Sequence, residues 1–385
     1  MKRDIIIFIT NIVILFSITG VMINVSPYFS TTITNFVSHI DSISNPYVEI
    51  KETSSIISQI ISKNKGNNSN TTQEDDKKVE PNIKKEDSST DVDLTAIPAD
   101  VKEAMEEAEK TIESEEVKGK TSEENYTGGG TIVSFGDVEV QNKIPISFYD
   151  LNIENLLKQK ADLQIKDISK PTILIYHSHT TESYSLLDVG YYTKSADLRS
   201  KDAARNMVRV GDEICKVLES KGFNVIHDRD THDENYSGSY ASSRKNMEEY
   251  LEKYPSIEIT IDVHRDSITY NNGTKVKPTA TVNGKKAARM MIISGCEYGK
   301  VKNFSDWEYN LRFSTAVTNK LNQMYSGIMR PILFSERKYN MDLTKNSFLL
   351  EVGTDANTLD EACYSGRLFG NALGELLLDE YVKEW

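Results

Sequence analysis

Cysteine is scarce in this chain of 385 residues, since only Cys215, Cys296 and Cys363 are present. No two of them are close in the sequence, so there is no C-x-x-C pair, which argues against zinc ligation by thiolates. An odd number of cysteines also excludes a fully paired disulfide framework. We therefore expect the three thiols to be buried as small hydrophobic side chains.

Positive charge is also in short supply. The chain has 45 Lys and Arg residues against 58 Asp and Glu, which gives a net charge of −13. Such a chain is poorly suited to binding nucleic acid through its phosphates. Hydrophobic residues make up only 38% of the sequence and charged residues 27%. This composition predicts one folded domain together with a polar, poorly ordered segment.

The longest apolar run lies at the start of the chain, from Ile5 to about Val25. About 20 helical residues span the hydrocarbon core of a bilayer, so residues 1–25 are predicted to be a cytoplasmic tip and a transmembrane signal-anchor. Lys2 and Arg3 precede the run, which favours a cytoplasmic N-terminus and an exported body. A cleaved signal peptide is the alternative, although no A-x-A site follows.

Residues 26–130 are predicted to be an extracytoplasmic stalk and polar linker, largely disordered. Stretches such as NKGNNSNTTQEDDKK have too few apolar side chains to offset the entropy of ordering. The segment from Pro98 to Lys110 could form a solvated helix, but its apolar stripe is thin. The folded domain is predicted to comprise residues 131–385.

In this domain, short apolar segments alternate with helical patterns. Strands are expected over 172–176, 223–226, 257–263, 290–294 and 347–352. Helices are expected from Ser200, over 243–253 and over 307–325, and a capping box at Thr358–Glu361 opens a terminal helix. This alternation predicts an α/β fold with a twisted, mostly parallel sheet and helices on both faces.

Three of these strands end in side chains that bind metals or transfer protons. His177, His179 and Glu182 follow the first strand, His264 ends the strand over 257–263, and Glu351 ends the strand over 347–352. In sheets of this kind, ligands bind beyond the carboxyl ends of the strands. We therefore expect these five side chains to lie close together.

Histidines and a carboxylate from different strands are typical of a catalytic zinc site with an open position for water. In an extended segment His177 and His179 share one face, as do Asp262 and His264, so that Asp262 could orient His264. Zinc lowers the pKa of bound water to about 7, and a nearby glutamate can take its proton. Other divalent ions also accept imidazole and carboxylate ligands. Arg265 is a candidate for orienting the substrate.

Five further segments are distinctive: ILIYHSHTTESY (173–184), RVGDEICKVLESKGFNVIHDRDTHD (209–233), IDVHRDS (261–267), WEYNLRFSTAV (307–317) and KYNMDLTKNSFLLEVGTDANTLDEA (338–362). They resemble the stage II sporulation protein P family, whose members are related to zinc-dependent N-acetylmuramoyl-L-alanine amidases. Together they cover most of residues 170–370. YHSHTTESY and DVHRDS are the most specific of these signals.

The resemblance implies an amidase-like catalytic domain that uses Zn²⁺ against the bond between the muramoyl group and L-alanine of peptidoglycan. It also implies cleavage within stem-peptide cross-links, and a single-pass membrane protein whose domain faces the intermembrane space of the sporangium. The implied partners are a stage II sporulation protein D-like lytic transglycosylase and a stage II sporulation protein M-like membrane protein.

By the same resemblance, Glu351 is the base and His264 a metal ligand. The ligand on the first strand is either His177 or His179. Related amidases carry a ligand glutamate near the next helix, where this chain has Lys201 and Asp202, so Glu182 is the replacement candidate.

Tyr184, Tyr191 and Tyr192 offer surfaces on which sugar rings could stack, or they pack the loop over the site. Two other functions remain open from the sequence. One is a wall-binding scaffold that has lost catalysis, and the other is a metal hydrolase acting on a different exported amide.

Overall fold

The computed structural model describes residues 92–147, 151–194, 196 and 198–383. The predicted membrane anchor and most of the predicted stalk and linker lie outside these residues. Within the described part of the chain, no helix is both long and apolar enough to cross a membrane.

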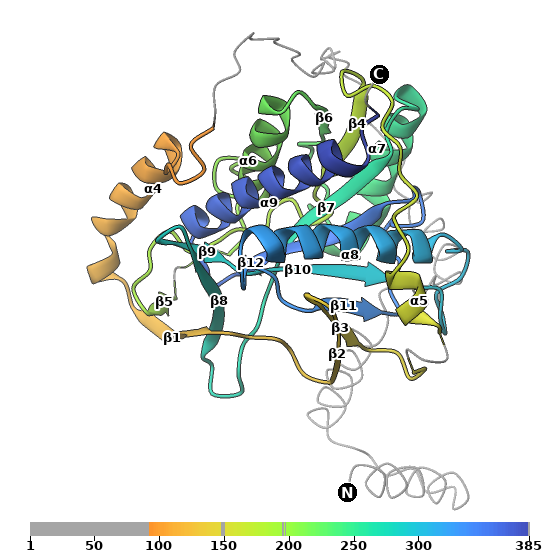
Figure 1. Cartoon of the computed structure of the whole chain (residues 1–385). Coiled ribbons are helices and arrows are strands. Elements are labelled where there is room, and N and C mark those ends of the chain that lie inside the picture. Colours follow the sequence, from red (N-terminus) through yellow and green to blue (C-terminus); the bar gives the residue numbers. More distant parts are fainter. Residues whose placement is uncertain (1–91, 148–150, 195, 197, 384–385) are drawn as a thin grey trace, which may run out of the picture. The chain divides into compact units, whose positions relative to one another are not determined.

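Eight strands form the central sheet, in the spatial order β2-β3-β11-β10-β12-β7-β4-β6 (Figure 1). Their bounds are β2 Thr131–Phe135, β3 Val138–Asn142, β4 Pro171–Tyr176, β6 Asn224–His227, β7 Ile259–Asp266, β10 Met290–Gly295, β11 Ile332–Ser335 and β12 Ser347–Thr354. The neighbours β3/β11, β11/β10, β12/β7, β7/β4 and β4/β6 are parallel, and β2/β3 and β10/β12 are antiparallel. The prediction of a mostly parallel α/β sheet is confirmed.

A smaller sheet has the strand order β5-β1-β8-β9. Its strands are β1 Val117–Glu124, β5 Tyr191–Thr193, β8 Lys275–Val282 and β9 Lys285–Ala288. β1 is parallel to β8 and antiparallel to β5, so it joins two segments that are distant in the sequence.

The helices are α4 Ala99–Glu109, α5 Ile153–Leu157, α6 Met207–Ser220, α7 Ser239–Lys253, α8 Trp307–Met324 and α9 Leu359–Glu380, with the 3₁₀ turns η1 Ile112–Ser114 and η2 Tyr236–Gly238. α9 begins with the predicted capping box, in which Thr358 and Glu361 each accept a hydrogen bond from the main-chain N–H of the other. The first of the expected helices begins later than predicted, because Asn206 and not Ser200 caps α6.

Helices cover both faces of the central sheet, and β4 shows why. Its residues Ile173 and Ile175 belong to the large core that also holds side chains of α6, α8 and α9. Leu174 and Tyr176 point the other way and pack with Met247 of α7. Successive strand residues face opposite sides, so an entirely apolar strand needs cover on both sides. α8 and α9 run across one face of the sheet in Figure 1.

The folded domain begins earlier than the sequence predicts. α4 and β1 lie within residues 92–130, which were expected to be a largely disordered linker. Arg367 of α9 is only 1% exposed, and its guanidinium donates to the main-chain carbonyls of Leu94 and Ala96, each at 2.6 Å. Asp100 of α4 pairs with Arg209 at 2.6 Å. The boundary predicted at residue 131 is therefore wrong for residues 92–130, whose weak apolar pattern hid their tertiary contacts.

Candidate active site

The candidate site lies where the neighbouring parallel strands β4, β7 and β12 end. On β7, Ile259, Ile261 and Val263 are part of the core beneath α6 and α9, so the alternate residues of that strand face α7. His264 is one of these alternate residues, and Glu351 of β12 is its partner in register. Two of the predicted residues thus lie side by side on the α7 face of the sheet.

His179 and Glu182 reach the same place from the loop that follows β4. The rings of His179 and His264 are edge to face, with their centroids 5.3 Å apart. Glu182 Oε2 lies 3.4 Å from His264 Nδ1. The structure therefore brings His179, Glu182, His264 and Glu351 together.

Asp262 lies beneath this group, completely buried. Its Oδ1 is 2.7 Å from His264 Nε2, the contact that the shared strand face predicts. Ser178 holds the carboxylate by donating from its N–H to Oδ1 at 2.9 Å and from its hydroxyl to Oδ2 at 2.6 Å. Asp262 therefore fixes His264 and the loop that carries His179 relative to each other.

His177 points to the opposite side of the sheet. Its Nδ1 is 2.9 Å from the carbonyl oxygen of Val263, and its Nε2 is 2.9 Å from Nε2 of His227. The expectation that His177 and His179 share a face is wrong, because β4 ends at Tyr176 and the chain then turns. His177 keeps the orientation of Ile175, whereas His179 is redirected by the turn.

Gly211 of α6 lets the helix lie directly against the paired histidines. A Cβ atom at this position would be 2.5 Å from His227 Nε2 and 2.8 Å from His177 Nε2, which is too close for any real contact. The histidines cannot move easily because they hydrogen-bond to each other and to the sheet. The glycine is therefore required by packing.

We expect Gly211→Ala to destabilise the domain by about 1–3 kcal/mol, because overpacking outweighs the better helix propensity of alanine. In a domain of this size the melting temperature should fall by a few degrees, roughly 2–4 °C per kcal/mol. Gly374→Ala in α9 is the matched control, since its Cβ would clash only with the flexible Lys221 side chain and would meet Leu218 at an ordinary contact distance of 3.6 Å. Equal melting temperatures for the two variants would contradict the prediction.

The charges at the site are strongly coupled. Burial disfavours the charged form of His264, but Asp262 and Glu182 outweigh burial and raise its pKa well above the usual value. Burial would raise the pKa of Glu182, yet His264 and Arg265 lower it to about 2. Burial lowers the pKa of His179 to about 4. Glu182 is thus a carboxylate, and His179 is a neutral imidazole with a lone pair to offer.

Glu351 differs from the other carboxylates of the site. Burial, reinforced by the charge of Asp266, raises its pKa to about 8. The residue as a whole is partly exposed, but its Oε2 is buried and finds no hydrogen-bond partner among the described residues. A glutamate with a pKa near neutrality is suited to accept and return a proton.

Arg265 extends away from these groups. Its Nε donates to the carbonyl of Ser183 at 2.8 Å, and its Nη2 donates to the carbonyl of Leu198 at 2.7 Å. Its main-chain N–H donates to Glu182 Oε2 at 3.3 Å. The guanidinium therefore holds the loop after Glu182 against β7 through main-chain contacts, which no sequence pattern indicates.

The loop between His177 and Glu182 is braced from a second side by Asp233, which is buried. Its carboxylate accepts from the N–H of Thr181 at 3.1 Å and from the Thr181 hydroxyl at 2.7 Å. Arg199 pairs with Asp233 at 2.7 Å and with Glu182 at 3.7 Å. These contacts fix the position from which Glu182 approaches His264.

The side chains at the site are of types that bind a metal ion, but their present arrangement is not that of a metal site. Two imidazoles and a carboxylate are ligands that zinc takes, and His179 Nδ1 is buried without a hydrogen-bond partner in the described part of the chain. His264 Nε2 lies 2.7 Å from Asp262 Oδ1, and its Nδ1 lies 3.4 Å from Glu182 Oε2. Within the described residues, however, no set of three or more His, Cys, Asp and Glu side chains converges as metal ligands.

Three tyrosines that the sequence did not single out surround the site, and we call Tyr236, Tyr240 and Tyr339 the aromatic wall. Tyr236 stacks on His179, with ring centroids 4.4 Å apart and planes 4° apart. Tyr240 stacks on Tyr339 at 4.7 Å and lies nearly parallel to the ring of His264 at 6.4 Å. No periodic pattern marks them, because they come from η2, α7 and a later loop.

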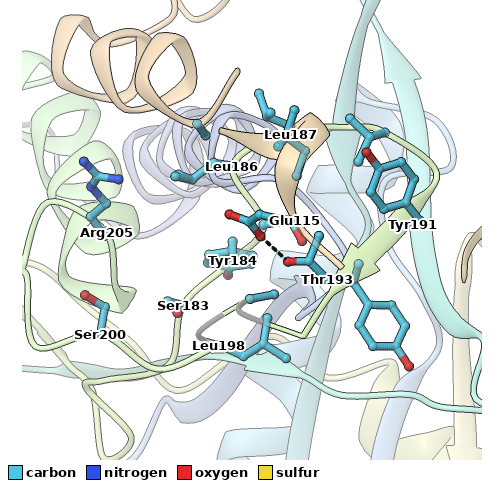
Figure 2. A pocket seen from close by; sticks show the side chains of 16 residues that line it. Glu115, Ser183, Tyr184, Leu186, Leu187, Tyr191, Thr193, Leu198, Ser200 and Arg205 are labelled. Carbon is cyan, nitrogen blue, oxygen red and sulfur yellow. Dashed lines mark hydrogen bonds between the residues drawn. The ribbon is translucent and has the colours of Figure 1, made fainter. Parts of the chain in front are cut away.

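The tyrosines proposed from the sequence lie elsewhere. Tyr184 is 4% exposed and donates its hydroxyl to the carbonyl of Val352 at 2.8 Å. Figure 2 shows Tyr191 in the lining of a separate pocket of about 300 Å³, where Thr193 donates to Glu115. Tyr192 also lines this pocket, which includes none of the six predicted site residues. The sequence left two roles for these tyrosines, stacking on sugar rings or packing of the loop. The structure shows packing for Tyr184.

Comparison with known proteins decides the family. The profile described as stage II sporulation protein P (SpoIIP) matches residues 28–374, which is most of the chain. The chain belongs to this family. The stage II sporulation protein P of Bacillus subtilis (strain 168) is 30% identical over 251 residues, which cover 60% of this chain and 59% of that relative. The chain thus aligns with less than two thirds of that relative's length.

Solved structures of amidases show a more distant likeness. N-acetylmuramoyl-L-alanine amidase AmiC2 of Nostoc punctiforme is 12% identical, with a TM-score of 0.33 over 54% of this chain and 96% of that chain. The CwlD amidase of Clostridioides difficile, solved in complex with the GerS lipoprotein, is 13% identical, with a TM-score of 0.32 over 54% of this chain and all of that chain. Likeness at this level identifies no activity.

Proposed function

We propose that this chain is a membrane-anchored peptidoglycan hydrolase of sporulation that cleaves the amide between the muramoyl group and L-alanine. The observation that carries the proposal is the meeting of His179, Glu182, His264 and Glu351 at the ends of three adjacent parallel strands. Membership of the stage II sporulation protein P family supports the substrate. Cleavage within stem-peptide cross-links is part of the same proposal.

His179, Glu182 and His264 are the residues that would hold a zinc ion. Such an ion would supply an activated water and a polarised amide carbonyl. Glu351 is the register partner of His264, and its buried Oε2 has no hydrogen-bond partner among the described residues. It accepts a proton and returns it to the leaving amine. Asp262 orients His264, and Arg265 holds the loop that presents Glu182.

The proposed setting follows the family. The domain acts outside the membrane, in the intermembrane space of the sporangium, tethered by residues 1–25. Its proposed partners are a lytic transglycosylase like stage II sporulation protein D and a membrane protein like stage II sporulation protein M. Neither the tether nor a partner lies within the described residues.

The test is product analysis of purified peptidoglycan after incubation with the full chain and zinc. Mass spectrometry should detect stem peptides released from muramic acid. We expect Glu351→Gln to keep its metal and to lose activity by roughly 10²–10⁴-fold, the usual contribution of general acid–base catalysis. Glu308→Gln is the matched control, because Glu308 lies on α8, on the other face of the sheet.

Two results would reject the proposal. Wild-type protein that binds the wall but releases nothing, with or without added zinc, would indicate a wall-binding scaffold. A fully active Glu351→Gln variant would remove Glu351 from the mechanism.

A further inference from the structure

The most exposed large hydrophobic side chain that the structure describes lies directly on the candidate site. Tyr236 is 59% exposed, although its ring is stacked on His179 and the guanidinium of Arg199 lies over it, 4.9 Å from the ring centroid. Exposed aromatic surface is unfavourable in water, and tyrosine is enriched where proteins bind other molecules. The ring of Tyr236 therefore combines exposed surface with direct contact to a residue of the candidate site.

The backbone is strained where it supplies another ring of the aromatic wall. Tyr339 has φ +42° and the following Asn340 has φ +60°, both in the left-handed region. A bulky residue in this region costs about 1–3 kcal/mol and persists only when the surroundings hold it there. Here the surroundings include Tyr240, on which Tyr339 stacks. Strain of this kind is found mostly at functional sites.

The scissile amide joins a sugar-bearing group to a peptide, and the aromatic wall suits one of these two better than the other. This preference rests on the proposed function. A sugar ring presents a face of C–H bonds, which carry slight positive charge, and aromatic faces are negative. The stem peptide presents amide groups, which prefer hydrogen-bond partners to ring faces. The aromatic wall is therefore a better match for the sugar than for the peptide.

We propose that the aromatic wall binds the sugar ring that carries the scissile amide, with Tyr236 in direct contact with it. Tyr236 is then a positioning residue of the reaction. Its ring keeps the amide over His179 and His264, while the peptide extends to the other side of the site.

The experiment compares two soluble ligands, a muramoyl-tripeptide and the same tripeptide without the sugar. Binding is measured by calorimetric titration of the full chain that carries Glu351→Gln, in the presence of zinc. This substitution is used so that the ligands are not cleaved. We expect the sugar-bearing ligand to bind about tenfold more tightly. The ratio of the two affinities should fall close to one in Tyr236→Ala and should be kept in Tyr236→Phe. In the active chain, Tyr236→Ala should raise KM about tenfold with little change in kcat.

Tyr191→Ala is the control, because Tyr191 lines the separate pocket of Figure 2. A ratio that persists in Tyr236→Ala, or that is lost in Tyr191→Ala, would overturn the inference. If wild type cleaves peptidoglycan while the ratio persists in Tyr236→Ala, the proposed function stands without the inference. If wild type neither cleaves the wall nor binds either ligand, both fall.

Discussion

His179→Ala and His264→Ala should each lose bound zinc, whereas His177→Ala should retain it. The sequence left the choice between the two neighbouring histidines open. In the structure, the ring of His179 lies 5.3 Å from that of His264, and His177 instead contacts His227 on the α6 side. Removal of one of three protein ligands from a zinc site should weaken metal binding by at least a hundredfold, since loss of a residue that only orients a ligand already costs roughly 10–100-fold. Metal analysis after dialysis measures this directly.

His177→Ala serves as the matched control, because it is the same substitution two residues away. We expect it to lower the free energy of unfolding by about 1–3 kcal/mol, since it leaves His227 and the Val263 carbonyl without their partner. Its zinc content should equal that of wild type in the folded protein. Zinc loss in His177→Ala together with zinc retention in His179→Ala would reverse the assignment.

The position of the site was predictable from the sequence because it depends on where strands end. An apolar run followed by polar, metal-binding side chains places those side chains at one edge of a parallel sheet. This reasoning located His264 and Glu351, which are indeed register partners. It could not decide whether His177 or His179 faces the site, because their orientations depend on a turn that starts directly after Tyr176.

The aromatic wall was not predictable for a different reason. Tyr236 and Tyr339 are about a hundred residues apart in the sequence, and each lies in a short irregular segment. Periodicity carries no information in such segments. Tyr184, Tyr191 and Tyr192 follow YHSHTTE in the sequence, but Tyr184 packs against the main chain of Val352, and all three line a pocket that includes none of the predicted site residues.

The N-terminal part of the domain escaped detection because its structure depends on tertiary partners. β1 reads VKGKTSEE, a sequence with little strand propensity, and all of its residues remain exposed or partly exposed. It forms because β8 and β5 offer main-chain partners on either side. α4 matches the helix that the sequence allows from Pro98 to Lys110, but it buries only Val101 and Ala104, so the sequence did not show that it packs on the domain. Local sequence patterns do not reveal packing of this kind.

A chain that starts at residue 131 should therefore be severely destabilised compared with one that starts at residue 84. The shorter chain lacks α4 and β1, so the edges of β5 and β8 lose their partner. It also removes the Leu94 and Ala96 carbonyls from the buried guanidinium of Arg367. Hydrogen bonds to charged groups contribute roughly 1.5–3 kcal/mol each, so these two alone account for about 3–6 kcal/mol. That is a large part of the roughly 5–15 kcal/mol by which domains are stable.

Urea unfolding of the two chains measures the difference, and Asp100→Ala in the longer chain provides the control. Asp100 is partly exposed and pairs with Arg209, whose side chain also pairs with Glu213, so its loss should cost about 1 kcal/mol or less. If the chain from residue 131 unfolds at the same urea concentration as the longer chain, residues 92–130 contribute nothing to folding. If it is unfolded without urea, peptidoglycan assays on it would report an absence of activity that belongs to the truncation and not to the site.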